Sequence, residues 1–430
     1  MSIDPPKSLP AVPESLLPRE HALYRPRHSS RQRTALTLAV LFLCAPALLL
    51  IVGVRPAEFE NRKLAAFPSI TDGWGFFTGL NSWANDHIPF RDKAVAAAGG
   101  ISLGLFGERP PVVTQPPQGT PGGPIPLPPK DPSLDQPEPT AYVRALEGKD
   151  DWLYLGFDIE DACEPTLKTD EVFNRLARLR QVVEASGRQF VLTIAPNKST
   201  MMPEYLPSRY YGKVCFERAS EYFWDRVVSK TGALDVRSGM REAAKQVGAP
   251  VYTKYDSHWT HAGGLVMARG VAEAVKPGGT GSWKVDPSSK VERQGDLAPL
   301  LGRVEKEQLQ AYEVKPDGST VRSRAVNGDS KQPQRFTQPA AEGVVNAKVA
   351  MLGDSFLFYV AQYVVAGFSD ITLQHVDGAV ADAHAVGRML AANDVVILEA
   401  AERNLVGGIN PMLDTKVIDA IAEELAKAPR

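Results

Sequence analysis

Short apolar runs alternate with longer amphipathic stretches through residues 141–430. The apolar runs end at glycine or polar residues, a pattern typical of buried strands. They predict strands at 151–156, 188–198, 232–238, 346–355, 371–376 and 394–400. The stretches between them have helical periodicity, which predicts helices at 171–186, 220–232 and 263–275.

This alternation predicts an α/β fold, in which helices cover both faces of a central, mostly parallel sheet. In that architecture, ligands bind where the strands end. Residues 280–346 break the rhythm because they are polar, rich in charged residues and weakly periodic. We therefore expect a polar insertion there, within a domain that extends over 141–430.

A long uncharged apolar segment lies near the N-terminus, at residues 34–54. A helix of that length can cross roughly 30 Å of hydrocarbon. Its flanks differ, because arginines precede it and glutamates follow it: Arg25, Arg27, Arg31, Arg33, Glu58 and Glu60. The positive-inside tendency then places residues 1–33 in the cytoplasm and the rest of the chain across the membrane.

Two other kinds of N-terminal segment share some of these features. A cleaved signal peptide also has a basic start, but its apolar part is shorter and a small-residue cleavage site follows it. A lipoprotein signal contains a cysteine, yet Leu43 stands before Cys44 where a small residue is expected. We therefore expect an uncleaved transmembrane anchor.

Two segments separate this anchor from the predicted domain. Residues 55–108 are expected to form a stalk followed by amphipathic helical pieces. Residues 109–140 are dense in proline and glycine, which favour extended, solvated conformations. We expect a linker or a long exposed loop over 109–140.

The composition excludes several classes of protein. Lysine and arginine number 48 and aspartate and glutamate number 50, a balance that gives no sign of nucleic-acid binding or of a disordered tail. The hydrophobic fraction of 43% suffices for a sizeable core. Only 3 cysteines are present, which excludes a disulfide-dense scaffold.

Ser355 is a candidate nucleophile because Gly353-Asp354-Ser355 closes a predicted strand. The serine would stand at the carboxyl end of that strand, with its hydroxyl and amide exposed at the start of a helix. A serine hydroxyl reacts poorly unless a base removes its proton and a third group orients the base. Glycine, aspartate and serine are also ordinary turn residues, so this motif alone does not identify a catalytic serine.

The segment VYTKYDSHWTHAGG, residues 251–264, supplies the missing groups. Asp256 and His258 are separated by one residue, between an apolar strand and a glycine-containing helix start. An Asp-x-His in an extended turn can direct both side chains to one side, so that the carboxylate fixes the imidazole tautomer. Trp259 would then form a wall of the site and limit the access of water.

Two other interpretations of this segment stay open. Asp256, His258 and His261 resemble part of a site for zinc or another divalent ion. Alternatively, Asp256 caps the following helix and His258 is a satisfied core residue.

The ordered set of motifs resembles the SGNH hydrolase-like O-acetyltransferases of the alginate O-acetyltransferase AlgJ/AlgX family. The similarity runs, with gaps, from about Glu60 to Asn404. Its motifs are ENRKLAAFP, GKDDWLYL, IAPNKSTMMPEYLP, YDSHW, GDSF and NDVVILEAAERNL. Asp256 and His258 precede Ser355, which is similar to the circularly permuted order of that family.

This resemblance implies an SGNH hydrolase-like (flavodoxin-like) sandwich, no cofactor, and three site roles. Ser355 would be the nucleophile, His258 the general base and then acid, and Asp256 the orienting carboxylate. The backbone amide of Ser355 is one natural oxyanion donor. Arg403 or Asn404 occupies the place of the family's asparagine donor.

Asn197 of APNKS is a further candidate donor to the oxyanion. Two features depart from the family pattern: Tyr255 stands before the Asp-x-His motif where a small hydroxyl residue is common, and the proline-rich stretch is unusually long. No long extension follows ERNL, so the chain resembles the membrane-anchored AlgJ type and not AlgX with its carbohydrate-binding module.

The resemblance implies a periplasmic O-acetyltransferase, anchored in the bacterial inner membrane, that modifies an exopolysaccharide. It also implies a multi-spanning membrane acyltransferase as the partner that delivers acetyl groups. Two other functions share the same motifs. One is a polysaccharide acetyl esterase, and the other is a non-catalytic polysaccharide-binding or assembly component.

Cys163 and Cys215 are candidates for a disulfide. Both lie in expected loops, on the side of the membrane where disulfides are allowed. Two free, buried thiols are the alternative, because sequence does not give the separation of two cysteines.

Overall fold

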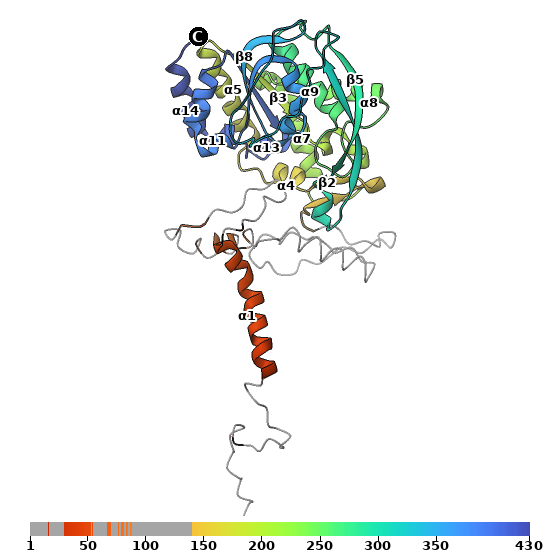
Figure 1. Ribbon diagram of the computed structural model, residues 1–430, viewed down its shortest axis with the longest axis vertical. Coiled ribbons are helices and arrows are strands. Elements are labelled where there is room, and N and C mark those ends of the chain that lie inside the picture. The colour runs from red at the N-terminus through yellow and green to blue at the C-terminus, as the bar shows by residue number, and fades with distance from the viewer. Residues whose placement is uncertain are drawn as a thin grey trace, which may run out of the picture. The chain divides into compact units, whose positions relative to one another are not determined.

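The computed structural model describes residues 140–430 throughout, residues 30–52, and scattered positions between 16 and 87. The chain divides into two compact units, Met1–Ala94 and Val95–Arg430 (Figure 1). Most of the predicted cytoplasmic segment, stalk and linker, at 1–33, 55–108 and 109–140, lies outside the described residues.

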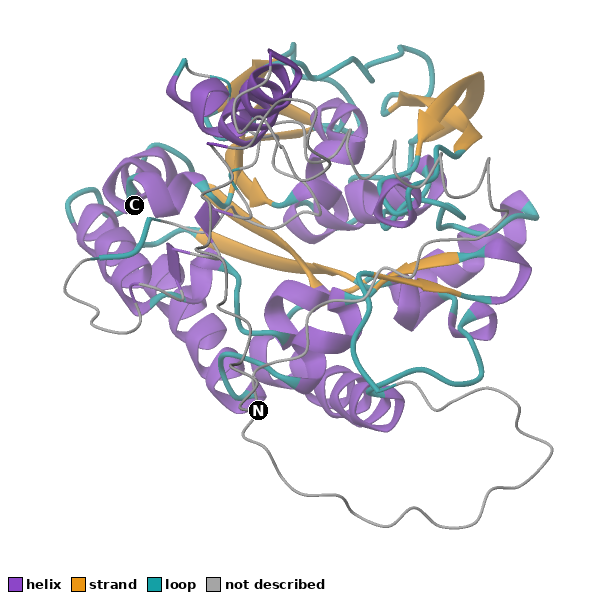
Figure 2. Cartoon of the chain, turned by 90° about the horizontal axis from the view of Figure 1, so that it is seen from below, coloured by secondary structure: helices purple, strands orange, loops and turns teal. Residues whose placement is uncertain are grey.

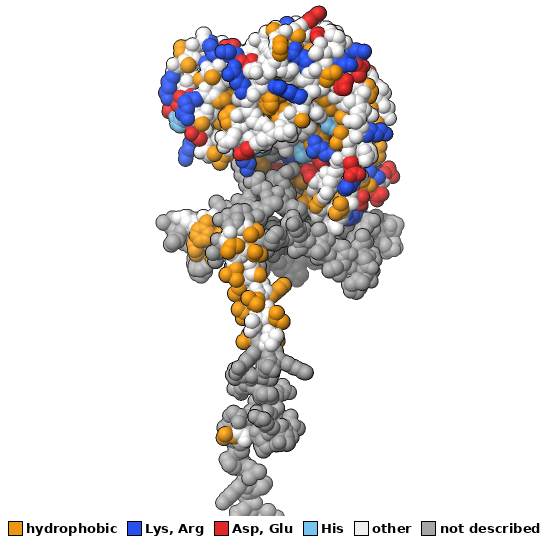
Figure 3. Space-filling model, in the orientation of Figure 1, with side chains coloured by type: hydrophobic (Ala, Val, Ile, Leu, Met, Phe, Trp, Pro, Cys, Tyr) orange, Lys and Arg blue, Asp and Glu red, His pale blue; other side chains and the backbone are white. Residues whose placement is uncertain are grey.

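The first unit contains the helix α1, Ser30–Ile51, which overlaps the predicted anchor at 34–54. Apolar side chains are exposed along it (Figure 3). Among the described side chains of α1, Phe42 is the most exposed apolar one, at 80%. Within the described part of the chain, no helix combines the length and the apolar character needed to cross a membrane.

A six-stranded sheet forms the centre of the second unit, in the order β4-β3-β10-β8-β9-β7. Every neighbouring pair from β4 to β9 is parallel, and β7 joins the edge antiparallel to β9. The predicted mostly parallel sheet is therefore confirmed. Its strands are β3 (Gln189–Ala195), β4 (Leu234–Asp235), β7 (Gln334–Thr337), β8 (Val345–Gly353), β9 (Phe368–His375) and β10 (Val395–Ala401).

Helices lie on both sides of this sheet (Figure 2). Because both faces are covered, the inner strands are continuous apolar runs, and every residue of β10 is buried. The main helices are α5 (Thr169–Ala185), α7 (Lys213–Thr231), α8 (Arg237–Val247), α9 (His261–Val275), α10 (Ser355–Ala366), α12 (Ala383–Ala391) and α14 (Thr415–Ala426).

Shorter helices and strands connect the central sheet to the helices that cover it. The strands β1 and β2 form a small antiparallel pair that opens the domain. Short helices follow several strands of the main sheet, where the chain turns. These elements are β1 (Ala145–Glu147), β2 (Leu153–Leu155), α4 (Phe157–Cys163), α6 (Lys198–Met201), α11 (Gly378–Ala381) and α13 (Glu402–Val406).

Residues 280–346 form part of the domain and not a separate polar insertion. They form an antiparallel hairpin of β5 (Lys284–Gln294) and β6 (Lys306–Lys315), and they also contribute β7 to the main sheet. Most side chains of β5 are exposed, which explains the polar pattern. The hairpin also reaches the segment that contains the Asp-x-His motif, because the Glu307 carboxylate accepts the backbone N–H groups of Lys254 and Tyr255 at 2.8 and 3.0 Å.

A disulfide joins Cys163, the last residue of α4, to Cys215 in the first turn of α7, with 5.6 Å between their Cα atoms. The bond closes a loop of 52 residues. Both cysteines lie in helices and not in the loops expected from the sequence.

Removing this disulfide is expected to destabilise the domain. Closing a loop of that length restricts the unfolded chain, so the double variant Cys163→Ser/Cys215→Ser should lose about 2–4 kcal/mol of unfolding free energy. Urea denaturation of the oxidised protein and the variant measures the difference. An unchanged midpoint would show that the disulfide contributes nothing to stability.

Candidate active site

Ser355 lies at the turn between β8 and α10. Gly353 ends the strand, Asp354 caps the helix by accepting the Phe356 N–H at 3.0 Å, and Ser355 is the first helical residue. A Cβ at Gly353 would come within 2.7 Å of side-chain atoms of Leu357 and Glu399, so only glycine fits this turn without displacing them. The serine hydroxyl therefore stands at a helix N-terminus, where the helix dipole favours negative charge.

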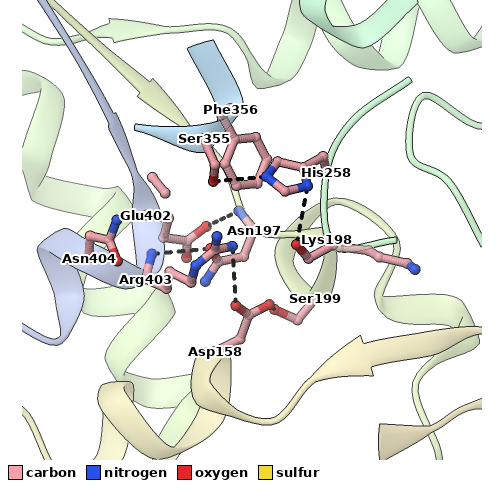
Figure 4. Close-up of polar contacts among 12 residues, drawn as sticks. Asp158, Asn197, Lys198, Ser199, His258, Ser355, Phe356, Glu402, Arg403 and Asn404 are labelled. Carbon is pink, nitrogen blue, oxygen red and sulfur yellow. Dashed lines mark hydrogen bonds and ion pairs between the residues drawn. The ribbon is translucent and has the colours of Figure 1, made fainter. Parts of the chain in front are cut away.

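The structure brings His258 to this serine (Figure 4). It also brings Asp256 to the other side of the imidazole. His258 Nε2 lies 2.8 Å from Ser355 Oγ, and His258 Nδ1 lies 2.6 Å from Asp256 Oδ1. Asp256 Oδ1 also accepts the backbone N–H of His258 at 2.9 Å. The carboxylate thus fixes both the loop and the imidazole, which presents its other nitrogen to the serine.

The protonation of this pair follows from its surroundings. Burial acts to lower the pKa of His258, but the charge and hydrogen bond of Asp256 outweigh it, so the pKa of the imidazole is raised. Burial acts to raise the pKa of Asp256, yet the contacts with His258 hold it at about 2. Asp256 is therefore ionised at neutral pH and stabilises an imidazolium.

Aromatic side chains hold the imidazole in place. The ring of Tyr359, one turn after Ser355, stacks on His258 at 5.1 Å and an angle of 10°. Phe356 contacts the same imidazole at 4.7 Å. Trp259 is fully buried and packs edge-on against Phe356 at 5.0 Å. The indole therefore lies in the core against Phe356, and its role as a wall of the site stays a prediction.

Asn197 lies at the same edge of the sheet as the nucleophile (Figure 4). It follows β3, as Arg403 follows β10 and Ser355 follows β8, and these three strands are adjacent. The Asn197 Oδ1 accepts the Arg403 backbone N–H at 3.1 Å, and its own N–H donates to Glu402 Oε2 at 2.8 Å. Since the amide oxygen is used in this way, the nitrogen Nδ2 is left to donate to another group.

The side chains of the other two candidate oxyanion residues have partners of their own. The guanidinium of Arg403 is buried, 5.1 Å from the Phe356 ring centre and 4.0 Å from Asp158 Oδ1. Asn404 Nδ2 donates to Asp354 Oδ2 at 2.9 Å, below the nucleophile turn. Both residues therefore support the turns that carry Ser355 and Asn197.

Three ionisable residues of the site were missed from the sequence: Glu402 and Lys198, which are buried, and Asp296, which is half-buried. The carboxylate of Glu402 accepts hydrogen bonds from Thr200 Oγ1 and Ser220 Oγ at 2.8 and 3.1 Å, in addition to the one from Asn197. Lys198 and Asp296 contact the segment that contains Asp256. Nothing in the sequence marks Glu402 and Lys198 as buried, because charged residues are rarely buried.

Lys198 lies below the Asp-x-His segment. Its Nζ donates to the backbone carbonyls of Lys254 and Asp256 at 2.8 and 3.1 Å, and it lies 5.0 Å from the ring centre of Trp152. Burial lowers the pKa of Lys198 to about 7. The turn after β3 therefore carries two residues of the site. Asn197 contacts the turn after β10, and Lys198 contacts the segment that contains Asp256.

Asp296 lies between β5 and β6, within the region expected to be an insertion. Its Oδ1 accepts the Ser257 N–H, and its Oδ2 accepts the Ser257 hydroxyl, both at 2.7 Å. Its Oδ2 also lies 3.7 Å from His258 Nδ1. This contact could not be predicted from the sequence, because Asp296 is 39 residues from Ser257.

The structure does not bring His261 together with Asp256 and His258 as the ligands of a metal ion. Both ring nitrogens of His261 are buried without a hydrogen-bond partner, and its ring packs against Tyr359 and Tyr363. Among the described residues, the group with metal-ligand spacing is Asp256, His258 and Asp296. In that group the 2.6 Å hydrogen bond occupies the Nδ1 and Oδ1 atoms that would face an ion.

The chain is similar to several known proteins. The family described as SGNH hydrolase-like domain, acetyltransferase AlgX, matches residues 145–362, a range that contains Asp256, His258 and Ser355. Among curated proteins, the probable alginate O-acetylase AlgJ of Pseudomonas putida is 24% identical over 155 residues, which cover 36% of this chain and 39% of that protein. The corresponding protein of Pseudomonas syringae is 26% identical over 171 residues, which cover 39% of this chain and 38% of that protein.

The matched regions thus span about two fifths of the length of these relatives. Two solved structures are also similar. The O-acetyltransferase domain of Pseudomonas putida AlgJ matches with a TM-score of 0.41 and 19% identity, over 65% of this chain and 98% of that chain. AlgX of Pseudomonas aeruginosa matches with a TM-score of 0.43 and 17% identity, over 64% of this chain and 67% of that chain. Because the family match covers half of its length, the chain belongs to the AlgX family of SGNH hydrolase-like acetyltransferase domains.

Proposed function

We propose that this protein is an O-acetyltransferase that acetylates an exopolysaccharide through an acetyl-serine intermediate. The observation that carries the proposal is the chain of contacts from Ser355 Oγ to His258 Nε2, at 2.8 Å, and from His258 Nδ1 to Asp256 Oδ1, at 2.6 Å. This is the arrangement that activates a serine for acyl transfer. The relatives named alginate O-acetylases support a polysaccharide acceptor.

In the first half-reaction, His258 takes the proton of Ser355 as Oγ attacks the acetyl carbonyl of the donor. The carbonyl oxygen becomes an oxyanion, and the donors available to it are the Ser355 backbone N–H and Asn197 Nδ2. The imidazolium then gives its proton to the leaving group as the bond to the donor breaks. Ser355 now carries the acetyl group as an ester.

In the second half-reaction, a sugar hydroxyl takes the place of the leaving group. His258, neutral again, removes the proton of that hydroxyl as its oxygen attacks the acetyl ester. Collapse of the second tetrahedral intermediate releases the acetylated sugar, and the proton returns to Ser355. Asp256 stays ionised throughout and holds the imidazole.

The cellular setting is also part of the proposal. The uncharged segment 34–54 and the arginines before it support attachment to the inner membrane, with the domain in the periplasm. The Cys163–Cys215 disulfide agrees with an oxidising compartment. Acetyl groups would come from a multi-spanning membrane acyltransferase.

A transfer assay tests the proposed reaction. The purified full chain is incubated with a chromogenic acetyl ester, with and without oligosaccharides of candidate exopolysaccharides. We expect ester turnover to rise with the acceptor, and mass spectrometry to detect acetylated sugar. Turnover by water alone, with no acetylated sugar for any acceptor, would mean an esterase.

The pH dependence of the reaction follows from His258. The base must be neutral to accept the serine proton, so activity falls as pH drops through the pKa of His258. Because Asp256 raises that pKa above its ordinary value of 6.5, the acidic limb of kcat/KM should have its midpoint above pH 6.5. A limb centred below this value would contradict the proposed protonation of the pair.

A further inference from the structure

The motif GKDDWLYL meets Lys198 of the motif APNKS next to the Asp-x-His segment. GKDDWLYL contains Trp152 and Tyr154, and none of its residues has a role in the proposed reaction so far. Lys198 is only 1% exposed. Its Nζ lies 5.0 Å from the ring centre of Trp152 and 5.2 Å from that of Tyr154, distances typical of cation–π contacts. The two motifs therefore place a buried amine beside two aromatic rings.

The two rings are themselves held in place. Trp152 stacks on Tyr205, with ring centres 4.4 Å apart and an angle of 6° between the planes. The hydroxyl of Tyr154 donates to the Met202 carbonyl at 2.6 Å. Both partners belong to the segment that follows Lys198 in the chain. Because the rings pack against the segment that carries the lysine, they limit where its Nζ can lie.

The amine uses its hydrogen bonds on the Asp-x-His segment. Lys198 Nζ donates to the backbone carbonyls of Lys254 and Asp256 at 2.8 and 3.1 Å. The Lys254 carbonyl also accepts the N–H of Leu153, in β2, at 3.0 Å. The segment that leads to His258 is therefore fastened at two carbonyls, one of which belongs to Asp256 itself.

Fixing the carbonyl of Asp256 restricts the direction of its carboxylate. Asp256 Oδ1 must reach both the N–H and the Nδ1 of His258, at 2.9 and 2.6 Å. The imidazole must in turn face Ser355 Oγ at 2.8 Å. A shift of the segment would lengthen these contacts, and small displacements of reacting groups lower the rate strongly.

The hydrogen bonds of the amine do not depend on its charge. Burial lowers the pKa of Lys198 to about 7, and the charges of Glu307, Asp296, Asp256 and Asp158 act against this shift. An ammonium group has three N–H donors and a neutral amine has two. Both forms can therefore donate to the two carbonyls, and the contacts persist on either side of neutral pH.

We propose that Lys198 is a positioning residue of the catalytic base: its side-chain amine fixes two carbonyls of the Asp-x-His segment, so that the imidazole of His258 faces Ser355. The inference rests on the proposed function of His258 as the base. It also gives the motif GKDDWLYL a role in the reaction, because the rings of Trp152 and Tyr154 hold the amine in place.

Methionine at this position removes the donor and keeps a side chain of similar length. In Lys198→Met the two carbonyls lose this partner and the segment can shift, so kcat should fall about 10- to 100-fold with little change in KM. Lys198→Gln keeps one N–H₂ group on a shorter side chain and should lose less. Lys245→Met, at a lysine on α8 whose side chain is 78% exposed, should keep full activity.

The pKa of His258 separates positioning from a purely electrostatic role. A displaced Asp256 stabilises the imidazolium less, so Lys198→Met should lower the pKa of His258 towards its ordinary value of 6.5. Loss of a positive charge alone would instead raise that pKa, because the imidazolium would be repelled less. A raised or unmoved pKa, or full kcat in Lys198→Met, would overturn the proposal.

This pKa can be measured without turnover. NMR titration of the full chain with ¹³C-labelled histidine resolves the imidazoles, and the signal of His258 among the 7 histidines is the one lost in His258→Gln. A lowered pKa in Lys198→Met supports the positioning role even where no acetyl transfer is detected, so the two proposals can fail separately. If Lys198→Met does not fold, Lys198→Gln decides: a lowered pKa supports the proposal, and a raised or unmoved pKa overturns it.

Discussion

Replacing Ser355 by alanine should lower kcat for acetyl transfer by about 10⁴- to 10⁶-fold, because the variant lacks the hydroxyl that forms the proposed covalent intermediate. The hydroxyl is the atom that His258 faces at 2.8 Å. The loss should be in kcat, while donor binding stays close to that of the unchanged protein. Stopped reactions analysed by intact-protein mass spectrometry should show an added acetyl group on the unchanged chain and none on the variant.

Controls separate this effect from a change in folding. Ser355→Ala removes only an oxygen at a helix start, so near-UV circular dichroism should be unchanged. Ser229→Ala, which removes an exposed hydroxyl on α7, should keep full activity. Normal acetylation of the polymer in cells that contain properly made Ser355→Ala protein would refute the catalytic role and favour a binding or assembly component.

The strand ends could be predicted from the sequence, and with them part of the site. Buried parallel strands appear as continuous apolar runs, and the polar residues that follow them lie at one edge of the sheet. Ser355 and Asn197 were placed correctly in this way, after β8 and β3. The Asp-x-His spacing also predicted that Asp256 and His258 act as a pair, which the 2.6 Å contact agrees with.

The direction of a side chain after a strand could not be predicted. Arg403 and Asn404 follow β10 as expected, but the chain turns at once into α13, and helical geometry directs them to Phe356 and Asp354. Trp259 follows the base by one residue, and its side chain packs into the core. The position of these residues could be predicted, whereas the partners of their side chains could not.

The contribution of the hairpin was missed for a different reason. Most side chains of β5 face solvent, so its sequence shows no apolar period that would mark a structured element. Its contacts with the site are made by two acidic residues, Asp296 and Glu307, 39 and 53 residues from their partners in the Asp-x-His segment. Such long-range polar contacts have no local signal.

Asn197 is expected to be the side-chain donor of the oxyanion hole. Replacing it by alanine should lower kcat by about 10²- to 10³-fold, the usual cost of removing one such donor. KM should change little, because the charge on the oxygen develops only in the transition state. Steady-state kinetics with the chromogenic acetyl ester give both parameters.

Two further variants test whether this loss comes from the amide nitrogen. Asn197→Asp keeps the oxygen that accepts the Arg403 N–H but has no N–H₂ group, so it should lose at least as much activity as alanine. Rescue by aspartate would show that Asn197 acts only by holding Arg403. Asn404→Ala should lower the free energy of unfolding by about 1.5–3 kcal/mol, because it removes a hydrogen bond to the Asp354 carboxylate, and should change kcat far less. If Asn404→Ala lost the activity that Asn197→Ala kept, the donor would be on the turn after β10 and not on the turn after β3.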